Sequence, residues 1–143
     1  MSDIFDSFTY FYRHEAWGEP DKMDLDYLHL LDEFRCSVGV RFNVICGYGL
    51  EGHTPGTQHQ YGLASDGYFE PGVSLLDQYL KAEQTGMTGI GLYPGRVSSI
   101  HTDRRDSKPE RWIGVKNQHP KAKHPWIYYP LTCENIEKFI LGY

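Results

Sequence analysis

The chain has 143 residues, of which 40% are hydrophobic and 15% aromatic, and its formal net charge at pH 7 is -5. This length is enough for one domain with a single hydrophobic core, and the aromatic content excludes a disordered chain. The acidic balance argues against a general nucleic-acid binder, because phosphate binding is driven by clustered Lys and Arg side chains. We therefore expect one monomeric domain over residues 1–143 that does not bind nucleic acid.

The N-terminal sequence MSDIFDSFTYFYRHE carries acidic residues where a secretory signal needs a basic segment followed by an apolar one. No stretch of the chain approaches the roughly 20 apolar residues of a membrane span. The three cysteines, Cys36, Cys46 and Cys133, lack CxxC spacing and are too few for a disulfide framework. These features predict synthesis in the cytoplasm without a signal peptide, reduced thiols and no association with a membrane.

The first predicted elements are a helix and a strand. Apolar side chains in residues 23–39 recur at steps of three to five residues, with Asp24 placed to cap a helix and Gly39 to end it. In residues 41–48 the alternation of side chains up to Cys46 is typical of a short strand. We interpret Cys46 as a small buried hydrophobic residue.

The rest of the chain alternates between loops and regular elements. Hydrophobic patterns predict strands at 62–69, 89–93, 98–104 and 126–129, and helices at 72–86 and 132–142, the last with Thr132 as N-cap. Residues 49–58 are rich in Gly and Pro and predict a loop, and residues 106–123 are polar and predict irregular structure. The order of elements predicts an α+β domain with helices packed on a central, mostly antiparallel sheet. The alternative is a small α/β sandwich with parallel strand pairs.

Two potential metal ligands, His59 and Asp66, lie seven residues apart in TQHQYGLASDGYF. Histidine nitrogen and carboxylate oxygen are common zinc ligands, and a catalytic zinc has three protein ligands and an open fourth position. Gly62 and Ala64 share a strand face with Asp66. We expect these small residues to leave room for a metal and a substrate.

The segment SSIHTDR offers a third ligand. His101 lies two residues before Asp103, so both side chains project from the same face of a strand. Together with His59 and Asp66, they form a candidate site for a metal and a neighbouring proton carrier. On spacing alone, structural roles for the histidines are an alternative interpretation.

The motifs CGYGL, TQHQYGLASDG, GIGLYPG and IHTDRR together resemble the zinc D-alanyl-D-alanine peptidase family. That family has a Ser-Gly-Tyr-Arg strand end, then Ser-x-His-x-x-Gly-x-Ala-x-Asp, and a later His. The resemblance covers about residues 7–112, and the opening SFTYFYRHEAWGEPDKM is similar to the phage- and prophage-type branch. It implies the hedgehog/DD-peptidase fold and a cell-wall lysin that acts after release from the cytoplasm or as a virion component.

Carried over position by position, the resemblance makes His59, Asp66 and His101 the ligands of Zn²⁺. Zinc would polarise the scissile carbonyl of a peptidoglycan stem peptide or crosslink and lower the pKa of a bound water to around 7. Asp103 would be the catalytic proton acceptor, or would orient His101 by a hydrogen bond. We expect substrate contacts from three residues close to these motifs: Tyr48, Gln58 and Arg104.

Two positions depart from the family's pattern. Ser98 stands where many members have a Glu three residues before the last His, and Gly49 stands where an Arg would hold a substrate carboxylate. Arg41, Arg96 and Arg104 are candidates to replace that Arg. Its loss disfavours a carboxypeptidase more than an endopeptidase. Both departures support an alternative function, a catalytically impaired metal-binding or structural module of the same fold.

Other conspicuous residues have simpler interpretations. We interpret His53 as a loop residue, and His14-Glu15 lacks the second His of an HExxH motif. The basic run at residues 121–124 predicts a solvated loop. Four aromatic residues are expected to form core or groove wall: Trp112, Trp126, Tyr128 and Tyr129.

Overall fold

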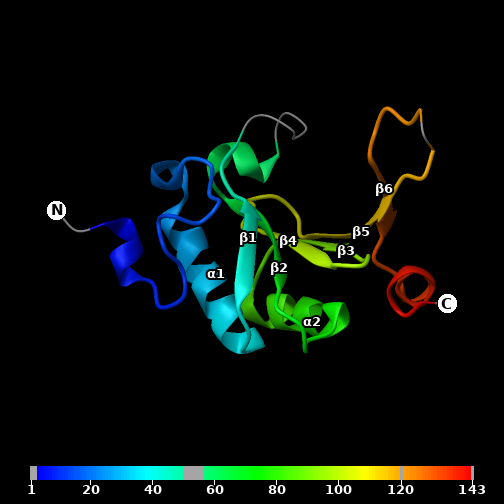
Figure 1. Ribbon diagram of the computed structural model, residues 1–143, viewed down its shortest axis with the longest axis horizontal. Helices are drawn as coiled ribbons and strands as arrows, with labels where there is room; N and C mark the ends of the chain where they lie inside the picture. Colours follow the sequence, from blue (N-terminus) through cyan, green and yellow to red (C-terminus); the bar gives the residue numbers. More distant parts are fainter. Residues whose placement is uncertain (1–2, 50–56, 120, 143) are drawn as a thin grey trace.

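One mixed sheet forms the centre of the computed structural model, which describes residues 3–49, 57–119 and 121–142. Within these residues the sheet has six strands: β1 (Phe42–Cys46), β2 (Ala64–Phe69), β3 (Gly89–Tyr93), β4 (Ser99–Asp103), β5 (Glu110–Lys116) and β6 (Trp126–Pro130). Their order across the sheet is β1-β2-β4-β3-β5-β6, and every neighbouring pair is antiparallel except β3 and β5 (Figure 1). The predicted α+β class with a mostly antiparallel sheet is confirmed.

Local capping signals set the ends of the two main helices. Asp24 caps α1 (Leu25–Val38) by accepting a hydrogen bond from the backbone N–H of Tyr27 at 2.8 Å, and Gly39 ends the helix with a φ of 86°. Ser74 and Gly86 have the same roles at the two ends of α2 (Leu75–Thr85). Both helices occupy the segments that the hydrophobic pattern predicted.

Helix α1 covers one face of the sheet. The Tyr27 hydroxyl lies 2.6 Å from Ser65 Oγ and 2.9 Å from Thr102 Oγ1, so it bridges β2 and β4. Side chains alternate along a strand, and therefore Asp66 and His101 lie on the opposite face. We call the side of Ser65 and Thr102 the helix face and the side of Asp66 and His101 the polar face.

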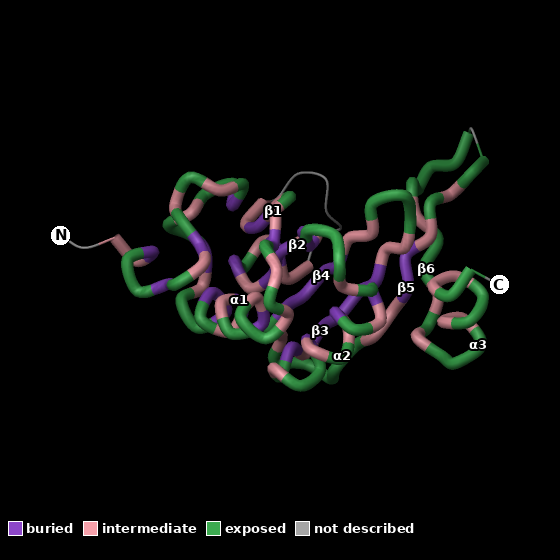
Figure 2. Tube along the Cα trace, turned by 60° about the horizontal axis from the view of Figure 1, so that its bottom comes forward, coloured by how far each residue is buried: buried purple, intermediate pink, exposed green. Residues whose placement is uncertain are grey.

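The hydrophobic core lies on the helix face and extends into the N-terminal segment. Figure 2 shows buried residues along α1 and the central strands, while the C-terminal hairpin and helix are mostly exposed. Aromatic residues that precede α1 join this core: Phe5, Phe8, Phe11 and Trp17. The N-terminal segment, with its short helices η1 (Ile4–Ser7) and η2 (Pro20–Lys22), is therefore part of the domain.

The C-terminal part differs from the sequence prediction. Residues 106–123 were expected to be irregular, but β5 lies within them and pairs in parallel with β3. The polar side chains of β5 gave no strand pattern in the sequence. One of them, Arg111, forms an ion pair with Glu83 of α2, with 2.9 Å between Nη2 and Oε1. The predicted helix at 132–142 is only the short α3 (Cys133–Asn135) followed by a π-helical turn (Ile136–Ile140), capped by Thr132 as expected.

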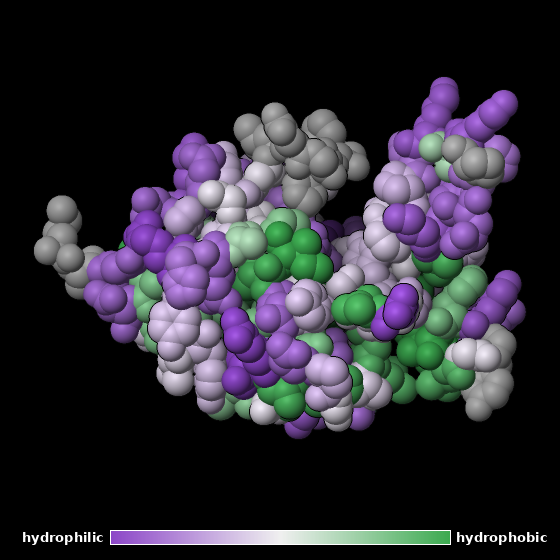
Figure 3. Space-filling model, in the orientation of Figure 1, coloured by the Kyte–Doolittle hydropathy of each residue, from purple (hydrophilic) through white to green (hydrophobic). Residues whose placement is uncertain are grey.

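The connection between β5 and β6 carries the basic run. Residues 121–125 are exposed, and Figure 3 shows hydrophilic side chains over the tip of this hairpin at the upper right. The prediction of a solvated loop there is confirmed. Among the described residues, none of the helices has the length and apolar character needed to span a membrane.

Candidate metal site

A β-bulge in β1 brings Cys46 to the polar face. β1 pairs with β2 in register as far as Val44 opposite Gly67, and then the register shifts so that Cys46 lies opposite Asp66. Without this shift, alternation would place Cys46 on the helix face with Val44. Instead its Sγ lies 3.1 Å from Asp66 Oδ2, so the interpretation of Cys46 as a buried hydrophobic residue is wrong.

The short helix η3 (Gln58–Tyr61) carries His59 to the same carboxylate. His59 Nδ1 lies 2.8 Å from the carbonyl oxygen of Gly47, and its Nε2 lies 3.2 Å from Asp66 Oδ2. A carbonyl can only accept, so Nδ1 carries a proton, and Nε2 faces the Asp66 carboxylate. Without a metal, Nε2–H of a protonated ring donates to Oδ2, and a cation between Nε2 and Oδ2 would take the place of that proton.

Gly62 has a different role from the one predicted. It ends η3 with a φ of 71°, and a Cβ built on it would lie 2.0 Å from the carbonyl oxygen of Lys22. The glycine is therefore required by the turn and by the close approach of the N-terminal segment, and the expectation that it clears space for a metal is wrong. Ala64 does lie on the polar face, buried and opposite Asp103.

A chain of charged groups continues from Asp66 across the polar face. His101 Nδ1 lies 2.8 Å from Asp66 Oδ1, and its Nε2 lies 2.7 Å from Asp103 Oδ2. Arg105 in turn donates to both oxygens of Asp103, through Nε to Oδ1 at 2.8 Å and through an Nη group to Oδ2. The imidazole of His101 is thus fixed at both nitrogens by two carboxylates.

These contacts shift the pKa values of the group. Burial alone would lower the pKa of His101, but hydrogen bonds with Asp103 and Asp66 outweigh it and raise the pKa to about 9. Burial would raise the pKa of Asp66, yet hydrogen bonds with His101 and His59 hold it well below its usual range. Burial and the charge of Asp66 raise the pKa of the Cys46 thiol. A bound cation would reverse this last effect, because coordinating thiols are deprotonated.

Glycines on the polar face make room for large side chains from neighbouring strands. A Cβ on Gly89 would lie 2.1 Å from Asp103 Oδ2, and one on Gly91 would lie 2.3 Å from the Trp112 ring. Gly114 of β5 similarly admits the Tyr93 ring, at 2.2 Å. The small residues that shape this face are therefore those of β3 and β5.

An aromatic row borders the charged chain. The Trp112 ring lies 5.1 Å from the His101 ring between centroids, and Trp112 Nε1 donates a hydrogen bond to the Tyr93 hydroxyl at 2.9 Å. The Trp126 ring meets Tyr93 edge-on at 5.0 Å. Trp112 and Trp126 thus lie on the polar face beside the candidate site, whereas Tyr129 packs on Phe139 at 4.5 Å.

The residues expected to contact substrate are spread around the site. Gln58 lies in η3 next to His59, and the partly buried Tyr48 packs against the core with the Lys22 ammonium over its ring. The Arg104 guanidinium lies 4.0 Å from Asp24 at the start of α1. Arg105, which the sequence prediction did not select, is the arginine of the IHTDRR motif that contacts Asp103.

The other candidate positions lie elsewhere. Gly49 donates its backbone N–H to the carbonyl oxygen of His59 at 3.3 Å, so it supports η3. Ser98 directly precedes β4, and Arg41 lines a pocket with Tyr10 and other N-terminal residues. His53 lies outside the described residues.

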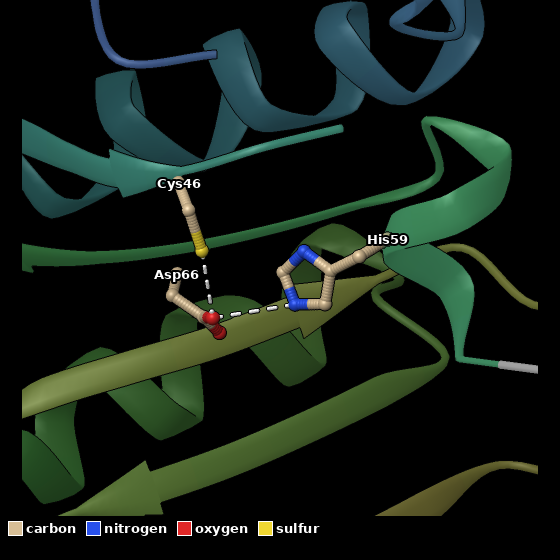
Figure 4. Close-up of side chains that lie close together, drawn as sticks. All are labelled: Cys46, His59 and Asp66. Carbon is tan, nitrogen blue, oxygen red and sulfur yellow. Dashed lines mark hydrogen bonds and ion pairs between the residues drawn. The ribbon is translucent and has the colours of Figure 1, made fainter. Parts of the chain in front are cut away.

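The donor set fits a zinc ion. One ligand atom each from Cys46, His59 and Asp66 lies within 4.8 Å of the other two, and Figure 4 shows the three side chains converging from β1, η3 and β2. Around a tetrahedral zinc, ligand nitrogen and oxygen atoms would be about 3.4 Å apart and sulfur and oxygen about 3.6 Å. The observed 3.2 Å and 3.1 Å are shorter than these values by about 0.2 and 0.5 Å, so the side chains must move apart when an ion binds.

Comparison with family models, curated proteins and solved structures finds no match to this chain.

Proposed function

We propose that the protein is a zinc-dependent peptidase that hydrolyses peptidoglycan stem peptides or crosslinks. The observation that carries the proposal is the convergence of His59 and His101 on the two oxygens of Asp66, from three separate elements. These are the three residues that the motif resemblance selects as zinc ligands. The substrate class, the hedgehog/DD-peptidase fold and a cell-wall location rest on that resemblance alone.

Each residue of the site has a role that its contacts support. Zinc, when bound, would activate a water and polarise the scissile carbonyl. His59 is oriented by the Gly47 carbonyl, which keeps Nε2 directed at the metal position. His101 is held by Asp103, so its ring cannot turn away from Asp66. The Trp112 ring packs against the His101 ring, with 5.1 Å between their centroids.

Asp103 fits the positioning role better than the role of proton acceptor. It is fully buried, and both of its oxygens accept hydrogen bonds from His101 and Arg105. The nearby Arg105 guanidinium and the imidazole of His101 hold the pKa of Asp103 below its usual range despite burial. A carboxylate in this state is a weak base, so it serves to orient His101.

A metal-binding module without turnover is the second candidate. Asp103 accepts hydrogen bonds from His101 and Arg105, which makes it a weak proton acceptor. Ser98 stands where many members of the family have a Glu in that role. Both observations favour a module without turnover. Proton transfer by such a group contributes about 10²- to 10⁴-fold to a hydrolytic rate. A protein without that group would keep the metal and lose most of the activity.

The test combines zinc analysis with hydrolysis of purified muropeptides. We expect about one zinc per wild-type chain, loss of zinc and cleavage in His59→Ala, and zinc affinity reduced by about 10- to 100-fold in Asp103→Asn. His124→Ala is the matched control, since this histidine is exposed in the β5–β6 loop. Wild-type protein without zinc after metal-replete expression would contradict the proposal. Zinc binding without cleavage would select the second candidate.

A further inference from the structure

The thiol of Cys46 lies within the metal site, at a position where the family's pattern has a serine. Its Sγ is 3.1 Å from Asp66 Oδ2, whereas Cys36 and Cys133 are exposed. The bulge between Val44 and Cys46 is what directs this side chain to the polar face. Bulges of this kind re-aim side chains next to functional sites.

The two oxygens of Asp66 have different neighbours. Oδ2 faces both Cys46 Sγ at 3.1 Å and His59 Nε2 at 3.2 Å, while Oδ1 faces His101 Nδ1 at 2.8 Å. A metal bound through Oδ2 and His59 therefore has the sulfur as an immediate neighbour. The donor set beside Oδ2 consists of one imidazole nitrogen, one carboxylate oxygen and one sulfur, all of which are zinc ligands.

We propose that Cys46 is a thiolate ligand of the metal held by His59 and Asp66. This inference rests on the proposed function for the presence of the metal, and it adds a sulfur donor to the ligands that the resemblance implies. His101, fixed by Asp103, contacts the other oxygen of Asp66 and lies outside this group of three ligand atoms. Because thiolates select soft and borderline metals, the site should prefer Zn²⁺, Co²⁺ and Cd²⁺ over Mg²⁺ and Mn²⁺.

The experiment uses Co²⁺ as a spectroscopic substitute for zinc in the full-length protein. Sulfur-to-cobalt charge transfer absorbs in the near ultraviolet, and the d–d bands in the visible report bound cobalt whatever the ligands. The exposed cysteines are removed in a Cys36→Ser/Cys133→Ser background, which leaves Cys46 as the source of any charge-transfer band. Cys46→Ser in the same background is the test variant, because serine preserves the size of the side chain.

We expect both bands in the background protein. In Cys46→Ser the charge-transfer band should disappear, the d–d bands should remain, and the affinity for Cd²⁺ should fall by more than about tenfold. Far-ultraviolet circular dichroism checks folding, and Cys46→Ala replaces the serine variant if that variant does not fold.

Three outcomes would overturn the inference, and they are distinguishable. Visible d–d bands without charge transfer in the background protein would show that a metal binds without Cys46, which leaves the proposed function intact. No cobalt bands at all in that protein would remove the metal site, and the proposed function with it. An undiminished charge-transfer band in Cys46→Ser would also exclude Cys46 as the ligand.

Discussion

The two faces of β4 are similarly buried but differ in chemistry. On the helix face Ile100 and Thr102 are fully buried, among apolar side chains and the Tyr27 hydroxyl. On the polar face His101 and Asp103 are 7% and 0% exposed, and their polar atoms all have charged partners. Apolar burial stabilises a fold, whereas buried charges are tolerated only when they are paired.

Within β4, one face therefore contributes mainly to the stability of the fold and the other to the chemistry of the site. The helix face should contribute most of the free energy of folding, because it carries the hydrophobic core. The polar face should contribute little, since the cost of desolvating its charges offsets their attraction. Substitutions on the two faces should therefore change different measurements.

The largest effect on folding is expected for Ile100→Ala. Ile100 is fully buried between the sheet and the helices, so truncation leaves a cavity and should lower the free energy of unfolding by about 2–5 kcal/mol. Urea denaturation measures this change. Zinc affinity of the folded variant should match that of the wild type. A folded Ile100→Ala protein with weakened zinc binding would show that the two faces are coupled.

A smaller effect, of about 1–3 kcal/mol, is expected for Gly91→Ala on the polar face. The added Cβ would lie 2.3 Å from the Trp112 ring and must displace this ring from its place beside His101. Urea denaturation and tryptophan fluorescence should both change. The control is Gly95→Ala in the turn before β4, where the nearest atom to an added Cβ is 3.9 Å away. Equal behaviour of the two variants would contradict the close packing of Trp112.

Local signals explain why part of the structure could be predicted from sequence. The caps of α1, Asp24 and Gly39, act through neighbouring backbone atoms and need no knowledge of the rest of the fold. His59, Asp66 and His101 were selected as one set, and each histidine contacts one oxygen of Asp66. The three ligand atoms that lie close enough to share one ion, however, come from Cys46, His59 and Asp66. The motif thus predicted which residues are neighbours, and their role as ligands stays a prediction.

The errors arise where strand pairing decides the outcome. Cys46 lies on the polar face because the register shifts by one residue, which depends on how β1 meets β2 and has no local sequence signal. Gly62 was assigned to the metal face, although its conformation is set by contact with Lys22, far away in the sequence. β5 was missed because, after β4, the chain crosses over β3 and pairs with its far edge. Each of these three errors concerns a long-range contact.

The smallest effect is expected for Ile127→Ala. This variant tests whether a residue on the helix face contributes to stability only where α1 and α2 cover it, or wherever it lies on that face. Strand pairing places Ile127 on the same face as Ile100, through Val115 and Ile113 of β5 and Leu92 of β3. Ile127 is nevertheless 40% exposed. Truncation there should lower the free energy of unfolding by less than about 1 kcal/mol, because the removed atoms already contact water. A loss equal to that of Ile100→Ala, measured in the same urea experiment, would mean that the core extends to β6; a small loss means that its stability depends on the cover of α1 and α2.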